Sequence, residues 1–310
     1  MQKAKTRTWR VYVNRVNIKK NYKYIYCFYV DYFKACTTME QIKKGKFIMT
    51  KKLLENIDAI PALKESVIAV EKVYQDVDSG IEDMQKAIEK DPIMVANILR
   101  LVNSPMYGLK SQITSIKQAI SLLGKGTVRT FVLNSVVDSN FELDLSPYGM
   151  NPAQFMKACD RQQALMINWI IRRKPTLIGT MAPAAFLVDI GRVVIAKTLS
   201  DEKKSIDMTK DITQAEKEVC GAQTTDVTAT LFRNWNLDPD IIHLIRYSDD
   251  PEGNVPEEKE MSAELKAVRE TVLPNGEITE ESISNAKETI EEFDLDLESY
   301  ERALDRVLAA

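Results

Sequence analysis

Apolar residues recur along most of this chain every three or four positions, which is the spacing of amphipathic helices. After Ser79, the apolar residues Ile81, Met84 and Ile88 fall on one side of a helix. Ser79 and Glu82 also have the spacing of a capping box, in which the two side chains satisfy free backbone amides at a helix start. The pattern therefore predicts a helix that begins at Ser79.

Pairs of Asp or Asn with a following proline predict three more helix starts, because proline is well suited to the first helical turn. They stand before apolar runs at Asp91-Pro92, Asn151-Pro152 and Asp238-Pro239. Ser115 is the predicted cap of a helix that ends at Gly124, and residues 127–137 form the next helix. Thr213 and Glu216 predict a second capping box. Since no segment has the alternation of a β-hairpin, the sequence predicts an all-α fold.

A change of composition near residues 145–149, Leu-Ser-Pro-Tyr-Gly, predicts a boundary between two packed helical subdomains. We expect the first subdomain to cover 49–147 and the second to cover 148–252. The acidic tail, 253–310, resumes helical patterning, so it is predicted to form further packed or partner-binding helices.

The first 48 residues differ in charge from the rest of the chain. They hold 12 of the 42 Lys and Arg residues but 2 of the 45 acidic residues, which gives a local net charge of +10 against −13 for the remainder. Three readings of this basic, tyrosine-rich segment stay open. It is an incorrectly assigned gene start before Met49, a disordered basic arm, or a functional contact surface that stacks on bases and holds phosphates.

The totals, 45% hydrophobic and 28% charged residues, are those of a soluble globular protein. No uninterrupted apolar run reaches the roughly 18 residues of a membrane span. The cysteines are far apart and form no CxxC pair: Cys27, Cys36, Cys159 and Cys220. We therefore expect a cytoplasmic protein without a membrane partner, a zinc ribbon or a disulfide framework.

Histidine, the usual general base and the commonest metal ligand, occurs once, as His243. The run PDIIHLIRY around it favours a partly buried helix residue over a ligand. The chain contains no GxSxG elbow, Walker loop or GxGxxG motif, and Gly124-Lys-Gly126 is better explained as a helix stop. These absences argue against most common enzyme classes.

The segment LRLVNSPMYGL, residues 99–109, predicts a helix that ends in a tight turn. Pro105 disfavours continuation of the helix, and Gly108 permits backbone angles that other residues resist. Four short elements around it occur in a fixed order: Asp91-Pro92, Asn103-Ser104 with Tyr107-Gly108, Ile113-Thr114-Ser115, and Leu122-Leu123-Gly124. In this order they resemble the HDOD domain, the HD-related output domain of bacterial signalling proteins. The wider resemblance covers about residues 53–251.

The stretch FLVDIGRVVIA, residues 186–196, resembles the His-Asp-Ile-Gly-Lys segment of the HD metal phosphohydrolases. Asp189, Ile190 and Gly191 are retained, but Val188 stands in the histidine position. The other family histidines fall near Gln163, on Thr224, and on the pair Ser248 and Asp249. The resemblance therefore implies an HD-type second subdomain whose metal-binding imidazoles have been lost.

A catalytic divalent ion needs several protein ligands, and it makes the hydroxide that such hydrolases use. We therefore expect no metal, no cofactor and no catalytic residue, although an oxygen-only Mg²⁺ or Mn²⁺ site of Asp189, Asp226 and Asp249 stays open. Otherwise Asp189 is structural and accepts hydrogen bonds from backbone amides or from Thr224 or Gln163. Its replacement by alanine is then expected to cost about 1–3 kcal/mol of stability.

The predicted function is that of a non-catalytic HDOD protein of bacterial signal transduction, a scaffold that binds a regulatory protein or a small signalling ligand. The candidate interaction turn is formed by Asn103, Ser104, Tyr107 and Gly108, beside the groove between the subdomains. One alternative is a residual phosphohydrolase that acts on nucleotides or cyclic dinucleotides. The other is nucleic-acid binding through residues 1–48, whereas we expect no nucleic acid on the helical body.

Overall fold

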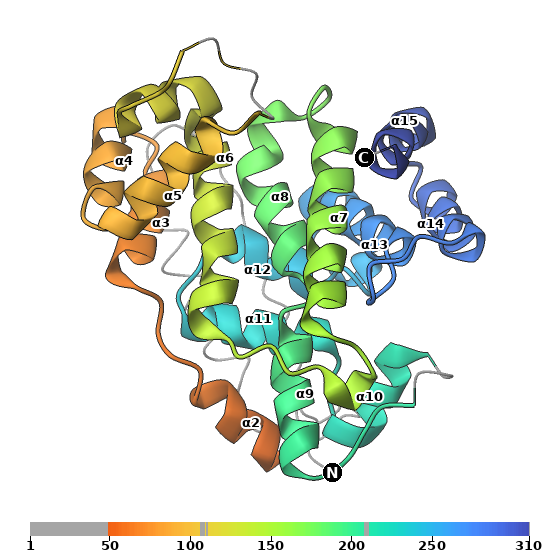
Figure 1. Ribbon diagram of the computed structural model, residues 1–310. Coiled ribbons are helices and arrows are strands. Elements are labelled where there is room, and N and C mark those ends of the chain that lie inside the picture. Colours follow the sequence, from red (N-terminus) through yellow and green to blue (C-terminus); the bar gives the residue numbers. More distant parts are fainter. Residues whose placement is uncertain (1–48, 106–108, 110, 208–210, 310) are drawn as a thin grey trace, which may run out of the picture. The chain divides into compact units, whose positions relative to one another are not determined.

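The computed structural model describes residues 49–309 except 106–108, 110 and 208–210 (Figure 1). The basic N-terminal segment, Tyr107 and Gly108 lie outside the described residues. Over the described ranges the chain forms helices and no strand, which confirms the all-α prediction. The α-helices are α2 (Lys51–Asp58), α3 (Glu65–Gln75), α4 (Ile81–Ile88), α5 (Pro92–Val102), α6 (Ile116–Asn140), α7 (Pro152–Ile170), α8 (Ile178–Leu187), α9 (Gly191–Asp201), α10 (Ile212–Cys220), α11 (Thr224–Asn234), α12 (Pro239–Arg246), α13 (Pro256–Thr271), α14 (Glu280–Glu292) and α15 (Leu297–Leu308). Short 3₁₀ helices are η3 (Ser146–Tyr148), η4 (Pro175–Leu177) and η5 (Pro251–Gly253).

Helices α3, α4 and α5 pack against α6 (Figure 1). Gly124 interrupts α6 with a φ of +81°, a left-handed conformation that glycine adopts without a steric penalty. The predicted end of a helix at Gly124 is therefore confirmed as a kink, after which a second helix begins.

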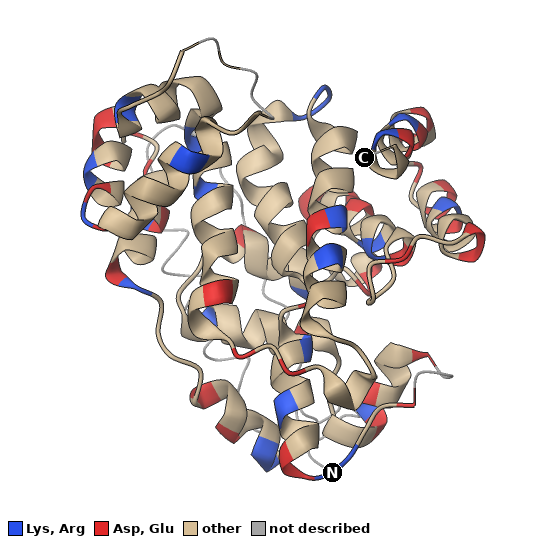
Figure 2. Ribbon diagram, in the orientation of Figure 1, with Lys and Arg blue, Asp and Glu red and all other residues tan. Residues whose placement is uncertain are grey.

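Helix α8 lies between α6 and α7 and contacts both (Figures 1 and 2). Its sequence, IGTMAPAAFL, has no charged residue, which suits a helix enclosed by others. The segment Pro175–Asp201, which contains α8 and α9, is the one helical stretch in the described ranges that is long and apolar enough to cross a membrane. Because 89% of its most apolar window is buried inside the protein, it serves here as the central core segment.

Most predicted helix starts are confirmed by the side chains that cap them. Asp91, Asn151 and Asp238 each accept a backbone N–H from the first turn of α5, α7 and α12. Ser115 does the same for α6, with its Oγ 3.2 Å from the nitrogen of Gln118. A short polar side chain directly before the helix satisfies an amide that has no partner within the helix.

Both predicted capping boxes were placed wrongly. Helix α4 is capped at Gly80, whose N–H donates to Asp83 over 3.0 Å, while the Ser79 hydroxyl donates to backbone carbonyls before the helix. Helix α10 is capped by Asp211, 2.7 Å from the nitrogen of Gln214. An aspartate two residues before Thr213 takes the cap, and Glu216 is drawn into the core instead.

The described residues from Met49 onward pack into one unit. Within that unit, the buried Arg129 of α6 donates to both carboxylate oxygens of Glu71 on α3, each over 2.7 Å. It also donates to Asp238, the cap of α12, over 2.9 Å and to the carbonyl of Gly179 on α8 over 2.8 Å. This network ties the first helices to the later ones; the subdomain boundaries after residues 147 and 252 stay predictions.

Candidate functional site

Asp189 lies in the short junction between α8 and α9, with 4% of its surface exposed. Its Oδ2 accepts a hydrogen bond from Nε2 of Gln162 on α7 over 2.9 Å. Its Oδ1 faces two guanidinium groups, 3.0 Å from Nη2 of Arg269 and 3.4 Å from Nη2 of Arg192. Burial alone would raise the pKa of Asp189, but the two arginines hold that pKa well below its ordinary value.

Arg269 reaches this position from α13, in the acidic C-terminal extension. It also donates to Asp249, which follows α12 and accepts the hydroxyl of Thr225 over 2.5 Å. One guanidinium thus pairs with two carboxylates from different parts of the chain. Such a forked contact is specific to arginine.

A second acid, Glu216 of α10, lies on the other side of Arg192, with its Oε1 3.6 Å from the arginine Nε. It accepts both the N–H and the hydroxyl of Thr224 over 2.7 Å and the hydroxyl of Tyr148 over 3.0 Å. Burial raises the pKa of Glu216 and, helped by the carboxylate of Glu216, that of Tyr148. We call the set Gln162, Asp189, Arg192, Glu216, Asp249 and Arg269 the arginine–carboxylate cluster.

The predicted positions of the lost histidines fall within or around this cluster. Gln163 does not contact Asp189: its Nε2 donates to the carbonyl of Ala182 over 3.1 Å, and its amide pairs with Asn134. Its neighbour Gln162 makes the hydrogen bond to Asp189 that was predicted for Gln163, because successive side chains on a helix point about 100° apart. Thr224 also has another partner than expected, since it donates to Glu216.

Val188 is buried, and its carbonyl accepts the hydroxyl of Thr228 over 2.9 Å. The Ser248 hydroxyl donates to the carbonyl of Ile245, so it helps to end α12. Asp226, the third acid of the alternative oxygen-only site, has its pKa raised by burial and is not among the partners of Asp189. Of the predicted positions, Arg269 contacts Asp189 and Asp249 and, over 3.5 Å, the hydroxyl of Ser248.

The donor set of the cluster does not fit a divalent metal ion. Oδ1 of Asp189 and Oδ1 of Asp249 both face guanidinium groups, and a cation between these two oxygens would meet like charge. The buried side-chain atoms of the cluster without a hydrogen-bond partner are three arginine donors, Arg192 Nε and Nη1 and Arg269 Nε, and one acceptor, Gln162 Oε1, which alone is too few oxygens for a metal site. Across the described part of the chain, no three His, Cys, Asp or Glu side chains form a group suited to a metal.

Sequence reasoning did not find the arginines or Glu216. Arg192 could have been found, because it lies one helical turn after Asp189. Arg269 could not, since nothing local in the sequence connects α13 with a residue 80 positions earlier.

The candidate interaction turn begins with a tightly held asparagine. The Asn103 side-chain amide donates to the carbonyls of Leu99 and Ile113 over 2.7 and 2.8 Å. Its Oδ1 accepts the N–H of Ile113 over 2.8 Å. Asn103 therefore closes the loop that leaves α5, and Ser104 lines a cleft beside it. Tyr107 and Gly108 lie outside the described residues.

Residues 60–251 match the family model of the HDOD domain. The chain belongs to the HDOD family. The matched range includes Asp189, Glu216 and Asp249 but ends before α13, so Arg269 reaches the HDOD domain from outside it.

Solved structures share this fold at low sequence identity. A protein from Shewanella amazonensis SB2B named as a candidate phosphohydrolase has a TM-score of 0.63 at 21% identity, over 84% of this chain and 94% of its own. An HDOD domain protein of unknown function from Geobacter sulfurreducens has a TM-score of 0.60 at 20% identity, over 83% and 94%. A candidate signal transduction protein from Marinobacter aquaeolei VT8 has a TM-score of 0.64 at 18% identity, over 85% and 60%.

An uncharacterized protein of Treponema pallidum (strain Nichols) is 22% identical over 208 residues. The match covers 63% of this chain and 38% of the Treponema protein, so this chain spans well under half of that relative.

Proposed function

We propose that this HDOD protein is a non-catalytic regulatory scaffold, in which two arginines take the place that a catalytic metal ion has in HD phosphohydrolases. The observation that carries this proposal is the pairing of Asp189 with Arg269 and Arg192. The retained acid is already neutralised by charges of the same chain. The proposal explains why the aspartate persists although the histidines of the motif are absent.

A metal ion at Asp189 would have to displace a buried guanidinium from one of its counter-charges, which is costly in a site removed from water. The ligands that remain are carboxylates already shared with Arg192 and Arg269. A metal-bound hydroxide, on which hydrolysis of this type depends, therefore has no suitable ligand set in the cluster.

The test combines metal analysis with turnover assays of the full chain. The protein is purified and then supplied with Mn²⁺ or Mg²⁺, and its hydrolysis of nucleotides and cyclic dinucleotides is compared with that of Asp189→Asn. We expect no tightly held metal and the same background rate for both proteins. Retained metal together with hydrolysis that disappears in folded Asp189→Asn would establish the phosphohydrolase that the name of the Shewanella protein suggests.

As a scaffold, the protein is proposed to act in the bacterial cytoplasm and to bind a regulatory protein or a small signalling ligand. The proposed contact region starts at the loop that Asn103 closes and continues along the cleft between α5–α6 and α7–α8. A pull-down from the native host, repeated with Tyr107→Ala, tests the turn. If the recovered partners do not change, the turn is not the docking surface.

The nucleic-acid alternative depends on residues 1–48, which lie outside the described residues, and stays a prediction. An intact-mass measurement of the native protein decides whether the segment is present. Strongly salt-dependent binding that disappears on deletion of 1–48 would support that alternative.

A further inference from the structure

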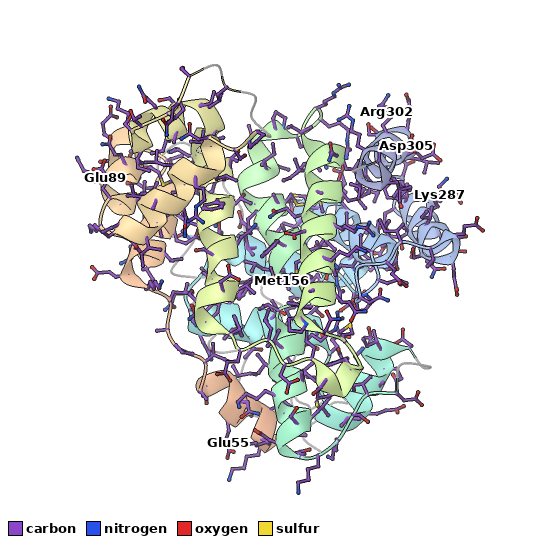
Figure 3. All side chains as sticks on the ribbon, in the orientation of Figure 1. Glu55, Glu89, Met156, Lys287, Arg302 and Asp305 are labelled. Atoms are coloured by element: carbon purple, nitrogen blue, oxygen red, sulfur yellow. The ribbon has the colours of Figure 1, made fainter. Side chains whose placement is uncertain are left out.

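A cleft of about 520 Å³ lies where α5 and α6 face α7 and α8. Helices α5 and α6 supply most of its lining, α7 contributes Met156 and Asp160, and α8 contributes Phe186. Met156, which lines the cleft, lies between the ribbons of α6 and α7 in Figure 3. The full lining is Asn97, Arg100, Leu101, Ser104, Phe131, Asn134, Ser135, Asp138, Met156, Asp160 and Phe186.

Two carboxylates from different helices line this cleft, Asp138 on α6 and Asp160 on α7. Within the described ranges neither takes part in a salt bridge or a side-chain hydrogen bond, whereas the acids of the arginine–carboxylate cluster are paired. Asp160 is accessible to solvent, yet partial burial raises its pKa, and the nearby Asp138 raises it further. The cleft thus carries two carboxylates of like charge that form no salt bridge with Arg100, the one cation of its lining.

Most of the other lining residues are apolar or form hydrogen bonds within the protein. Leu101, Phe131, Met156 and Phe186 provide an aliphatic and aromatic surface. The one cation of the lining, Arg100, donates to Oδ1 of Asn97 over 2.6 Å. A ligand with an apolar body and a positive group therefore finds complementary surfaces.

We propose that this cleft binds a small organic cation, an amine or guanidine carried on an apolar or aromatic body. The inference rests on the proposed scaffold function, for which it names the chemical class of the ligand. The cleft volume lies within the range of about 300–1,000 Å³ that is usual for small-molecule sites. A divalent metal is disfavoured, because the described residues include no group of three ligands suited to one.

The test uses three probes of matched shape: 2-phenylethylamine as the cation, 2-phenylethanol as the neutral analogue, and 3-phenylpropionate as the anion. Their affinities for the full chain are measured by ligand-observed NMR titration at neutral pH. We expect the amine to bind about tenfold more tightly than the alcohol, and the anion to bind most weakly. Equal affinities for the three probes, or no binding of the amine, would overturn the proposal.

The double variant Asp138→Asn and Asp160→Asn keeps the shape of the cleft and removes its charge. We expect it to lower the affinity for the amine to that for the alcohol and to leave the alcohol unaffected. The matched control is Asp305→Asn on α15, an exposed acid far along the chain from the cleft residues (Figure 3), which should change nothing. An amine affinity that the double variant does not lower would place the binding elsewhere.

A short lysine-containing peptide serves as a fourth probe. If this peptide binds and the free amine does not, the cleft recognises a protein segment, and the small-ligand proposal is wrong. These titrations are independent of the metal and turnover assays. If the amine fails to bind, the proposal of a non-catalytic scaffold is not affected. If the protein shows metal-dependent hydrolysis, that proposal is wrong, but the result does not show what binds in the cleft.

Discussion

Nη2 of Arg269 lies 3.0 Å from Oδ1 of Asp189, although the two residues are 80 positions apart in the chain. This contact joins α13, which follows the HDOD domain, to the junction that carries the Asp-Ile-Gly sequence. The C-terminal extension therefore supplies a positive charge that balances the buried carboxylate of Asp189 in the HDOD domain.

Asp189→Asn should lower the free energy of unfolding by about 3–5 kcal/mol, because it removes a buried charge that two guanidinium groups share, and leaves Arg269 with Asp249 alone and Arg192 with Glu216 alone. For Asp189→Ala, the sequence alone suggested a loss of about 1–3 kcal/mol from unmet hydrogen bonds. Urea denaturation followed by circular dichroism measures the loss. Asp305→Asn, an exposed substitution, should stay within about 0.5 kcal/mol of the parent. A loss at Asp189 as small as that of the control would disprove the structural role.

The stability difference between the parent and Asp189→Asn should shrink in acid. Because the pKa of Asp189 is lower in the fold than in the unfolded chain, its stabilisation is fully present above the unfolded pKa of about 3.9. It is lost as the pH falls below that value toward the folded pKa. Urea unfolding of both proteins from neutral pH to about pH 3.5 tests this. Gly191→Ser, which removes no titratable group, provides the pH-independent comparison.

Arg269→Ala and Asp249→Ala should be coupled. Both remove the same contact, so the double variant should be less destabilised than the sum of the single variants, with a coupling of about 0.5–3 kcal/mol. Arg302→Ala combined with Glu298→Ala, a solvent-exposed pair on α15, should give about 0.3–0.5 kcal/mol. If the two cycles gave equal couplings, Arg269 would be an ordinary surface arginine.

Local rules predicted the helix starts at Asp91 and Asn151 because a cap side chain and its amide lie within one turn. The same rules failed at Thr213. A nearer cap was available in Asp211, and Glu216 bonds to Tyr148, which lies 68 positions away in the chain. Tertiary contacts of this kind decide which of several local patterns a helix uses.

From the sequence, Asp189 could be identified as the centre of the candidate site, because it is the one acid in an apolar run. The resemblance identified the region around Gln163 but missed the facing residue, Gln162, by one position, which on a helix is a change of side. Arg269 lies on a helix outside the matched range, and the fold alone brings it to Asp189.

Gly191→Ser should destabilise the protein by about 1–3 kcal/mol, because α9 approaches α11 too closely for a side chain. A Cβ at Gly191 would lie 2.4 Å from the carbonyl oxygen of Thr224 and 2.7 Å from the nitrogen of Thr228, both of them backbone atoms. Gly80→Ser is the matched control, since a Cβ there meets a flexible Glu82 carboxylate at 3.4 Å and serine suits a helix cap. Equal stabilities of the two variants would show that α9 moves away at little cost.

Arg129→Lys should cost on the order of 2–4 kcal/mol although it keeps the positive charge. The buried guanidinium donates at once to Glu71, Asp238 and the carbonyl of Gly179, and a single ammonium has neither the planar shape nor the reach to replace that fork. Arg302→Lys on α15 makes the same substitution at an exposed ion pair (Figure 3) and should lose less than about 0.5 kcal/mol. Both are measured by urea denaturation against the parent. A loss in Arg129→Lys as small as that in Arg302→Lys would mean that charge alone, and not the branched guanidinium, joins α3 to α8 and α12.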